Sequence, residues 1–217
     1  MGLRDRRARD TRRRIFASAS ELFSADGYHG TPVERIVARA GVAKGTFFVH
    51  FPTKGAIVTE LVRLQVHSAL RARERVVGDG ADPSLAIWTT IVTMGRHASA
   101  NRALSRAVIA ASLESEELAG ETAAVLEELR VVVLGDARRL SRSQRTGMTA
   151  EKFVAAVMTA YYGAVLYWCS NPAAPPLDEA IVALSTSILN VHPVMVREVP
   201  RKERRHAKTL VARSARS

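Results

Sequence analysis

The stretch GVAKGTFFVHF, residues 41–51, joins a glycine turn to one lysine and an aromatic run. It predicts a short helix, about residues 44–51, that follows a three-residue turn. Phe47 and Phe51 are expected to face inward, which leaves the polar start of the helix exposed. A helix this short does not fold alone in water, so it must be held by neighbouring helices.

The preceding segment TPVERIVARAG, residues 31–41, predicts the helix that holds it. Thr31 is expected to act as the N-cap, with Pro32 at the first helical position and Glu34 completing a capping box. Gly41 suits the left-handed residue that ends a helix. Two short helices joined by a turn with glycine form a helix-turn-helix unit.

The rest of the chain shows helical periodicity and no sustained strand alternation. The fold class expected is all-α, with about nine helices in two parts: an N-terminal three-helix DNA-binding domain and a C-terminal helical bundle. The domain limits expected are a basic N-terminal arm at 1–9, the helix-turn-helix domain at 10–54, a connecting helix at 55–77, a ligand-binding and dimerisation domain at 82–192, and a basic, disordered tail at 193–217.

Positive charge is concentrated at the two ends of the chain. Residues 1–54 hold 11 lysines and arginines against 5 acidic residues, and residues 193–217 hold 8 against 2. This asymmetry indicates a polyanionic partner, either nucleic acid or an acidic membrane surface. Charge alone does not separate these partners from solubilising arms.

The residues near the short helix at 44–51 suit contact with DNA. Lys44 is a mobile charge for phosphate or guanine, Gly45 allows close backbone approach, and Thr46 can bind a base edge or offer its methyl group to thymine. Lys54 is expected to clamp a phosphate. The arginine-rich segment 4–14 is expected to reach along the DNA backbone or into a minor groove.

The segment GYHGTPVERIVARAGVAKGTFFVHFPTKGAIV, residues 27–58, resembles the tetracycline-repressor (TetR) family of bacterial transcription regulators. The resemblance implies a homodimer of this fold, most simply a repressor that binds a palindromic operator and is released by a small-molecule effector; an activator stays open. Ala43 and Phe48 depart from the family pattern, where hydroxyl side chains are usual. The DNA-binding residues expected are Thr31, Arg35, Ala43, Lys44, Gly45, Thr46, Phe48, His50 and Lys54, together with Arg6, Arg7 and Arg9.

The last two expected helices, at 149–170 and 177–191, carry the family's dimer interface by the same resemblance. The helix at 149–170 has two apolar stripes, which predicts one face for its own core and one for a partner. The interface residues expected are Phe153, Val157, Ala164, Val165, Trp168, Ile181, Leu184 and Ile188. The effector-binding residues expected are Trp88, Met94, His97, Leu104, Leu126, Leu129, Tyr161 and Tyr162. For any one of them taken singly, ordinary core packing is the better-supported role.

Other function classes find less support. The sequence has no phosphate-binding loop, dinucleotide fingerprint, zinc-protease motif or nucleophile elbow, so no enzyme, cofactor or metal site is predicted. Its single cysteine, Cys169, excludes a disulfide framework, and the absence of a signal peptide favours the cytoplasm, at the nucleoid. Residues 153–169 approach the length of a membrane span, but a helix apolar all round is more often buried in protein. No membrane is therefore expected as a partner, and binding of anionic lipid by the basic ends is the alternative.

Overall fold

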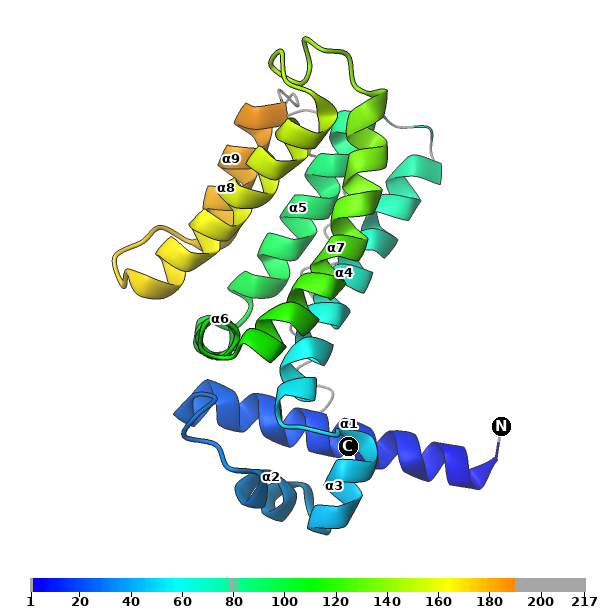
Figure 1. The fold of residues 1–217 in the computed structure, drawn as a ribbon, viewed down its shortest axis with the longest axis vertical. Helices are drawn as coiled ribbons and strands as arrows, with labels where there is room; N and C mark the ends of the chain where they lie inside the picture. The colour runs from blue at the N-terminus through cyan, green and yellow to red at the C-terminus, as the bar shows by residue number, and fades with distance from the viewer. Residues whose placement is uncertain (1, 79, 81, 190–217) are drawn as a thin grey trace. The chain divides into compact units, whose positions relative to one another are not determined.

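The computed structural model describes residues 2–78, 80 and 82–189, and all regular elements within these ranges are α-helices. In chain order they are α1 (Leu3–Asp26), α2 (Val33–Ala40), α3 (Lys44–His50), α4 (Gly55–Gly78), α5 (Pro83–Ser99), α6 (Arg102–Glu114), α7 (Glu116–Arg139), α8 (Ala150–Ser170) and α9 (Leu177–Leu189), as Figure 1 shows. The all-α fold class is confirmed. The tail expected at 193–217, and the last residues of the domain expected at 82–192, lie outside the described residues.

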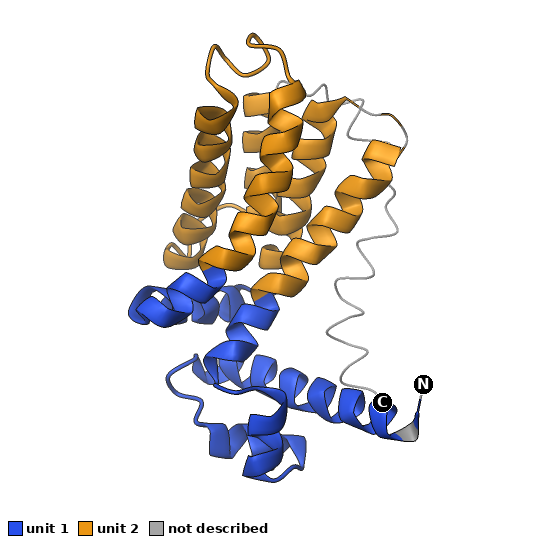
Figure 2. Ribbon diagram, turned by 45° about the vertical axis from the view of Figure 1, so that its right-hand side comes forward, with its two compact units in different colours: residues 1–61, 101–122, 203–217 blue, residues 62–100, 123–202 orange. Residues whose placement is uncertain are grey.

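The chain forms two compact units, which are distinguished by colour in Figure 2. Within the described residues, unit 1 consists of 2–61 and 101–122, and unit 2 consists of 62–100 and 123–189. Helices α4 and α7 each contribute to both units. The segment 101–122 groups with the N-terminal helices although it is distant in sequence, so the compact units differ there from domain limits that follow chain order.

A shared core explains why 101–122 belongs to unit 1. Ile15, Ala19, Leu22 and Phe23 follow the helical repeat along α1 and are buried against Ile36 of α2 and Phe47 of α3. Ala107 and Ala111 of α6 and Leu118 of α7 are buried in the same cluster. Helix α6 therefore packs along α1. Its buried residues belong to the same core as those of the helix-turn-helix.

Local signals in the sequence set the limits of α2, α3 and α4. Gly41 adopts the left-handed conformation (φ 63°, ψ 45°) and ends α2, as expected. Phe51 leaves the helical conformation directly before Pro52 and ends α3. Thr53 Oγ1 accepts a hydrogen bond from the Ala56 N–H at 3.0 Å, which caps the start of α4.

Unit 2 is a helical bundle centred on α5. Most residues of α5 are buried, and α5 packs most extensively against α9. Gly95 lies directly against Ile181, and the Trp88 indole Nε1 donates to Thr186 Oγ1 at 3.2 Å. These contacts hold α5 and α9 face to face, with α8 packed beside both helices.

Helix α8 is long and apolar enough to cross a membrane by length and composition, with a mean hydropathy of 1.3. It is the one described helix that meets these criteria. Phe153, Val157 and Trp168 on α8 are nevertheless buried within unit 2. Because the core helices of globular bundles meet the same criteria, the length and composition of α8 give little support to a membrane span.

Candidate nucleic-acid interface

Helix α3 is anchored by one face and exposed on the other. Phe47 and Phe51 are fully buried in the core of unit 1, and their rings pack 6.1 Å apart. Lys44 and Gly45 are exposed, as are Phe48 and Val49 at 43% and 80% of their surface. The buried positions of Phe47 and Phe51 agree with the sequence prediction, as do the exposed positions of Lys44, Gly45 and Phe48. Thr46, also expected on the exposed part, is partly buried. Val49 was not among the residues predicted to contact DNA, although its position one residue after Phe48 on a short helix places it on the same exposed side.

The other predicted residues of this region lie close to the exposed face of α3. Ala43 is exposed and precedes the helix without any side-chain cap, while Thr46 is partly buried. His50, at the end of α3, is also partly buried, and its backbone carbonyl accepts a hydrogen bond from Arg12. The structure thus brings Lys44, Gly45 and Phe48 together and leaves Thr46 and His50 at the margin of the exposed surface.

Lys44 is paired with a carboxylate from the preceding helix. Its Nζ donates to Glu34 Oε1 at 2.6 Å, and both side chains are exposed. The pKa of Glu34 is below its ordinary value. The largest cause is the hydrogen bond from Lys44, and a backbone hydrogen bond and the lysine charge contribute less. Glu34 therefore remains ionised beside the lysine at neutral pH, and it does not complete the capping box expected from the sequence.

The capping box is wrong because Thr31 uses its hydroxyl as a donor. Thr31 is fully buried, and its Oγ1 donates to the Gly27 carbonyl at 2.8 Å. Pro32 occupies the N-cap position of α2 and provides no side-chain bond. Thr31 thus closes the turn between α1 and α2 and has no exposed surface for phosphate.

Lys54 also has a role within the fold. Its Nζ donates to the backbone carbonyls of Tyr28 and Thr31 at 2.8 and 3.1 Å, and it lies 4.1 Å from the centroid of the Tyr28 ring. Desolvation by the surrounding protein lowers the pKa of the Lys54 ammonium group. The phosphate clamp expected at Lys54 therefore competes with two carbonyl partners that the chain already supplies.

Two arginines fasten the helices of unit 1 to one another. Arg35 Nη2 contacts Asp26 Oδ2 at 2.8 Å, so this residue predicted to bind DNA ties α2 to the end of α1. Arg12 donates to the His50 carbonyl at 2.6 Å, pairs with Glu60 at 3.3 Å and stacks over the Phe51 ring. Arg12 thereby joins α1, α3 and α4, a role that sequence reasoning missed because each of its partners is distant in sequence.

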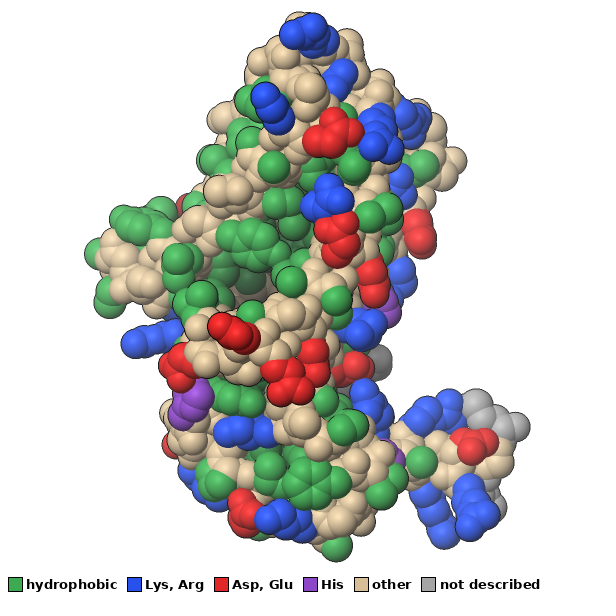
Figure 3. Space-filling model, in the orientation of Figure 1, with side chains coloured by type: hydrophobic (Ala, Val, Ile, Leu, Met, Phe, Trp, Pro, Cys, Tyr) green, Lys and Arg blue, Asp and Glu red, His purple; other side chains and the backbone are tan. Residues whose placement is uncertain are grey.

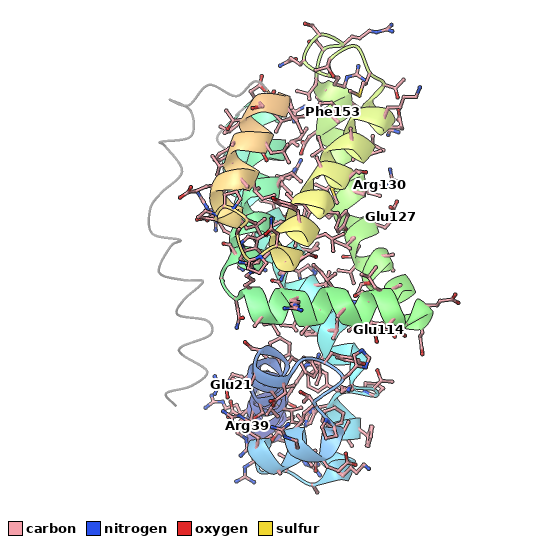
Figure 4. All side chains as sticks on the ribbon, turned by 90° about the vertical axis from the view of Figure 1, so that its left-hand side faces the viewer. Glu21, Arg39, Glu114, Glu127, Arg130 and Phe153 are labelled. Atoms are coloured by element: carbon pink, nitrogen blue, oxygen red, sulfur yellow. The ribbon has the colours of Figure 1, made fainter. Side chains whose placement is uncertain are left out.

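A similar ion pair lies on the outer side of α1 and α2. Figure 4 labels Glu21 and Arg39, and the Arg39 guanidinium donates to the Glu21 carboxylate. With the pairs made by Arg35 and Lys44, acidic partners accompany most of the basic side chains of α2 and α3. Arginines without a described acidic partner are found at the start of α1.

The arginine-rich N-terminus is helical rather than an extended arm. Helix α1 begins at Leu3, where the Asp5 carboxylate accepts a hydrogen bond from the Gly2 N–H at 3.2 Å. Arg6, Arg7 and Arg9 are exposed on this helix, and within the described part of the chain no ion pair involves them. Figure 3 shows basic side chains gathered at this end of α1. The basic arm expected at 1–9 is continuous, from Leu3 on, with the rest of α1.

The helix-turn-helix unit is similar in sequence to a known protein family. Residues 15–61 match the sequence model for bacterial regulatory proteins of the tetR family. Residues 15–61 therefore carry a DNA-binding segment of the tetR type.

Two HTH-type transcriptional regulators are similar in sequence to this chain. The HTH-type transcriptional regulator UidR of Escherichia coli K12 is 29% identical over 112 residues, and RutR of the same organism is 29% identical over 139 residues. These matches cover 52% and 62% of this chain. They span 57% of UidR and 65% of RutR, which is less than two thirds of either relative.

Solved structures of low sequence identity share the fold. The transcriptional regulator FadR of Bacillus subtilis, in complex with stearoyl-CoA, superposes with a TM-score of 0.64 at 21% identity, covering 82% of this chain and 98% of that one. At this identity the similarity concerns the helical architecture.

The residues predicted to bind an effector do not form one group. Leu104 belongs to the core of unit 1, whereas the other seven lie in unit 2. Of these seven, Trp88, Met94, Leu129 and Tyr161 are buried, Leu126 and His97 are partly buried, and Tyr162 is 43% exposed. His97 Nε2 lies 2.7 Å from Ser68 Oγ, so its imidazole links α5 to α4.

Most residues predicted for the dimer interface are buried within the single chain. Phe153, Val157, Val165, Trp168 and Ile181 are buried, while Ala164, Leu184 and Ile188 are partly buried. The exposed side of α8 instead carries the residues Ala155, Ala156, Thr159, Tyr162, Gly163, Leu166 and Tyr167. The two-stripe pattern of the sequence indicated two faces but did not tell which of them fills the chain's own core.

Proposed function

We propose that this chain is a homodimeric repressor that binds a palindromic DNA operator through α3 and releases it when a small molecule binds unit 2. The observation that carries the proposal is the division of α3 into a buried aromatic anchor and an exposed face of Lys44, Gly45, Phe48 and Val49. Helix-turn-helix proteins place such a face in the major groove. The regulator acts in the cytoplasm, at the nucleoid.

The exposed face of α3 suits contact with thymine-containing base pairs. Phe48 and Val49 offer apolar surface, and the methyl group of thymine is the apolar feature of the major groove. A β-carbon at Gly45 would meet no atom within 4 Å, so this position leaves room for close approach of the duplex. Lys44 can bind a phosphate or a guanine when its ammonium group leaves the Glu34 carboxylate.

The start of α1 supplies sequence-independent affinity. Arg6, Arg7 and Arg9 form an exposed positive helix that is suited to phosphates flanking the major groove. Each phosphate neutralised releases counterions, which makes binding weaken steeply with salt. The helical conformation fixes the spacing of these charges. The arginines therefore bind phosphates from one side of the duplex, whereas an extended arm would insert into the minor groove.

The exposed side of α8 is the surface proposed for the second copy. Tyr162, Leu166 and Tyr167 are each more than two fifths exposed, and Gly163 lies between them without a neighbour near its β-carbon position. Figure 3 shows hydrophobic side chains gathered over α8. Exposed apolar patches of this kind mark interfaces, and a copy of the same face covers it symmetrically.

The effector is proposed to enter the interior of unit 2. Thr89 Oγ1 on α5 is buried without a hydrogen-bond partner in the described structure. A buried hydroxyl without a partner is costly, and a polar group on a ligand would remove that cost. Ligand binding then favours one arrangement of the two copies over another and changes DNA affinity by linkage.

Footprinting on DNA that flanks the chain's own gene tests DNA recognition. A protected palindrome is expected with the wild type, and Lys44→Gln and Phe48→Ala should weaken protection about tenfold or more, as loss of base contacts does. Arg71→Gln, an exposed arginine of α4 in unit 2, is the matched control. Equal protection by all four proteins, or none by the wild type, would contradict the proposal.

Light scattering tests self-association. Leu166→Glu places a charge on the exposed side of α8 and should give monomers, whereas Leu113→Glu, on an exposed residue of α6, should leave the dimer mass unchanged. A wild-type monomer would remove the two-copy part of the proposal without affecting the assignment of α3.

A further inference from the structure

A pocket lies where α7 passes through a loop into α8, within unit 2. Its volume is about 360 Å³, and its lining includes Arg138, Arg142 and Arg145 together with Met148 and Glu151. The three arginines come from a segment of only eight residues, and the one acidic residue leaves an excess of positive charge. In the orientation of Figure 1 this corner is at the top, where Figure 3 shows basic side chains gathered.

Arg145 lacks an acceptor that its position requires. Its Nε is buried, and no hydrogen-bond partner is present among the described residues. A guanidinium N–H removed from water without an acceptor is costly, and buried polar groups in folded proteins are nearly always paired. The remaining acceptor is therefore one that the chain itself does not supply.

The loop between α7 and α8 holds the Arg142 side chain in place. Arg142 Nε donates to the Gly147 carbonyl at 3.2 Å, while the Gly147 N–H returns a hydrogen bond to the Arg142 carbonyl at 2.8 Å. Thr146 and Gly147 both have positive φ, at 52° and 80°, which makes the turn tight enough for this exchange. The Arg142 side chain is thus fixed before any ligand arrives, which lowers the entropy cost of binding.

A carboxylate already occupies one side of the pocket. Glu151 Oε1 accepts from Arg138 Nη2 at 3.1 Å. The pKa of Glu151 is lowered, mainly by a backbone hydrogen bond and to a smaller extent by the hydrogen bond from Arg138. This side of the pocket stabilises an anion, and the charge of Arg138 is largely satisfied there. Arg142 and Arg145 remain for an external anion.

We propose that Arg142 and Arg145 bind the phosphate group of a small phosphorylated molecule in this pocket. A phosphate presents several oxygens to two planar guanidinium groups, which bind it through paired N–H donors. The volume of the pocket exceeds what one phosphate fills, so part of the attached organic group also enters, beside Met148. The site does not depend on the DNA-binding function proposed above.

Titration calorimetry and thermal unfolding of the full chain test the site with three probes: inorganic phosphate, glycerol phosphate and succinate. Ionic strength is matched with chloride in every sample. Phosphate and glycerol phosphate should each raise the Tm, and Arg145→Gln should weaken their binding about tenfold or more, as loss of a charged hydrogen bond does. Arg71→Gln, an exposed arginine outside the pocket, should bind both as the wild type does.

Further variants separate binding from folding. Whatever the Tm of Arg145→Gln without ligand, the deciding quantity is the increase in Tm that phosphate produces in each variant. A purely structural residue does not alter that increase. Glu151→Gln removes the competing carboxylate and should tighten phosphate binding. No phosphate-dependent increase in the wild type, an equal increase in Arg145→Gln, or an equal response to succinate would overturn the proposal.

Discussion

Nζ of Lys44 lies 2.6 Å from Oε1 of Glu34, and this pair joins the two short helices of the helix-turn-helix at its surface. The side chains are 58% and 63% exposed, so the pair adds little to stability. Its larger effect is on binding. The lysine on α3 is held by an acidic group of α2, and a DNA phosphate or base must compete with that carboxylate.

Glu34→Gln should therefore strengthen binding to duplex DNA. The expected gain is about threefold at low salt, within the range of exposed ion pairs. Because the pKa of Glu34 is lowered in the folded chain, its carboxylate is ionised throughout about pH 6–8 and the gain should be constant there. It should disappear only as the pH falls through that lowered pKa, where Glu34 in the wild type is itself neutralised. Fluorescence anisotropy with labelled operator measures the affinity.

Glu127→Gln is the matched control for this prediction. Glu127 is an exposed acid of α7 that pairs with Arg130, and Figure 4 labels both residues on α7. Its substitution changes net charge equally but lies outside the helix-turn-helix. An affinity gain of the same size in both variants would show that only net charge matters.

Lys54→Met should destabilise unit 1 rather than weaken a phosphate contact. The ammonium group donates to two backbone carbonyls, and their loss costs about 1–3 kcal/mol. Denaturant unfolding measures the loss, and the salt dependence of DNA binding should be unchanged. Lys152→Met, on an exposed residue of α8, controls for loss of charge. A shallower salt dependence with unchanged stability would instead assign Lys54 to phosphate.

Much of the helix-turn-helix was predictable because local chemistry fixes it. Gly41 ends α2 since few other residues tolerate a left-handed conformation, and Pro52 prevents α3 from continuing. The inward positions of Phe47 and Phe51 follow from their size and spacing. These features depend on residues near one another in sequence, where patterns are informative.

Other features depended on contacts that sequence patterns do not contain. The arginine-rich start of α1 has no apolar stripe, so nothing distinguished a solvated helix from a flexible arm until the Asp5 cap was seen. The Thr31 hydroxyl can donate or accept, and only the position of the Gly27 carbonyl decides. Helices α6 and α1 pack together although they are about ninety residues apart in sequence. The partners of Lys54 are also distant from it in sequence.

The Arg73–Asp136 pair should be important for the stability of unit 2. Asp136 is 1% exposed and accepts from Arg73 Nε and Nη2 at 2.5 and 2.6 Å. Removing one partner leaves the other charge buried, so Asp136→Asn should lower the free energy of unfolding by about 3–5 kcal/mol. Urea unfolding measures this, with the exposed Asp178→Asn as control.

The double variant Arg73→Met/Asp136→Leu separates pairing from burial. Replacing both charges with apolar groups avoids an uncompensated charge and should recover most of the stability lost in Asp136→Asn. If Asp136→Asn alone proved as stable as the wild type, the close two-point contact between these side chains would be contradicted.

Gly95→Ala should destabilise the contact between α5 and α9. A β-carbon at Gly95 would lie 2.8 Å from Cγ2 and 3.0 Å from Cβ of Ile181, closer than packed carbons approach. Overpacking of this kind costs about 1–3 kcal/mol, although alanine is the better helix former by about 1 kcal/mol. Thermal unfolding should show a lower Tm.

The glycine of α7 at position 135 provides the matched comparison, because a β-carbon there meets nothing within 4 Å. Gly135→Ala should therefore gain stability from helix propensity alone. In Gly95→Ala/Ile181→Ala the crowding γ-carbons are absent, so the double variant should lose less than the sum of its two single variants. Additive losses, or a Gly95→Ala variant as stable as Gly135→Ala, would show that α5 and α9 do not pack through this pair.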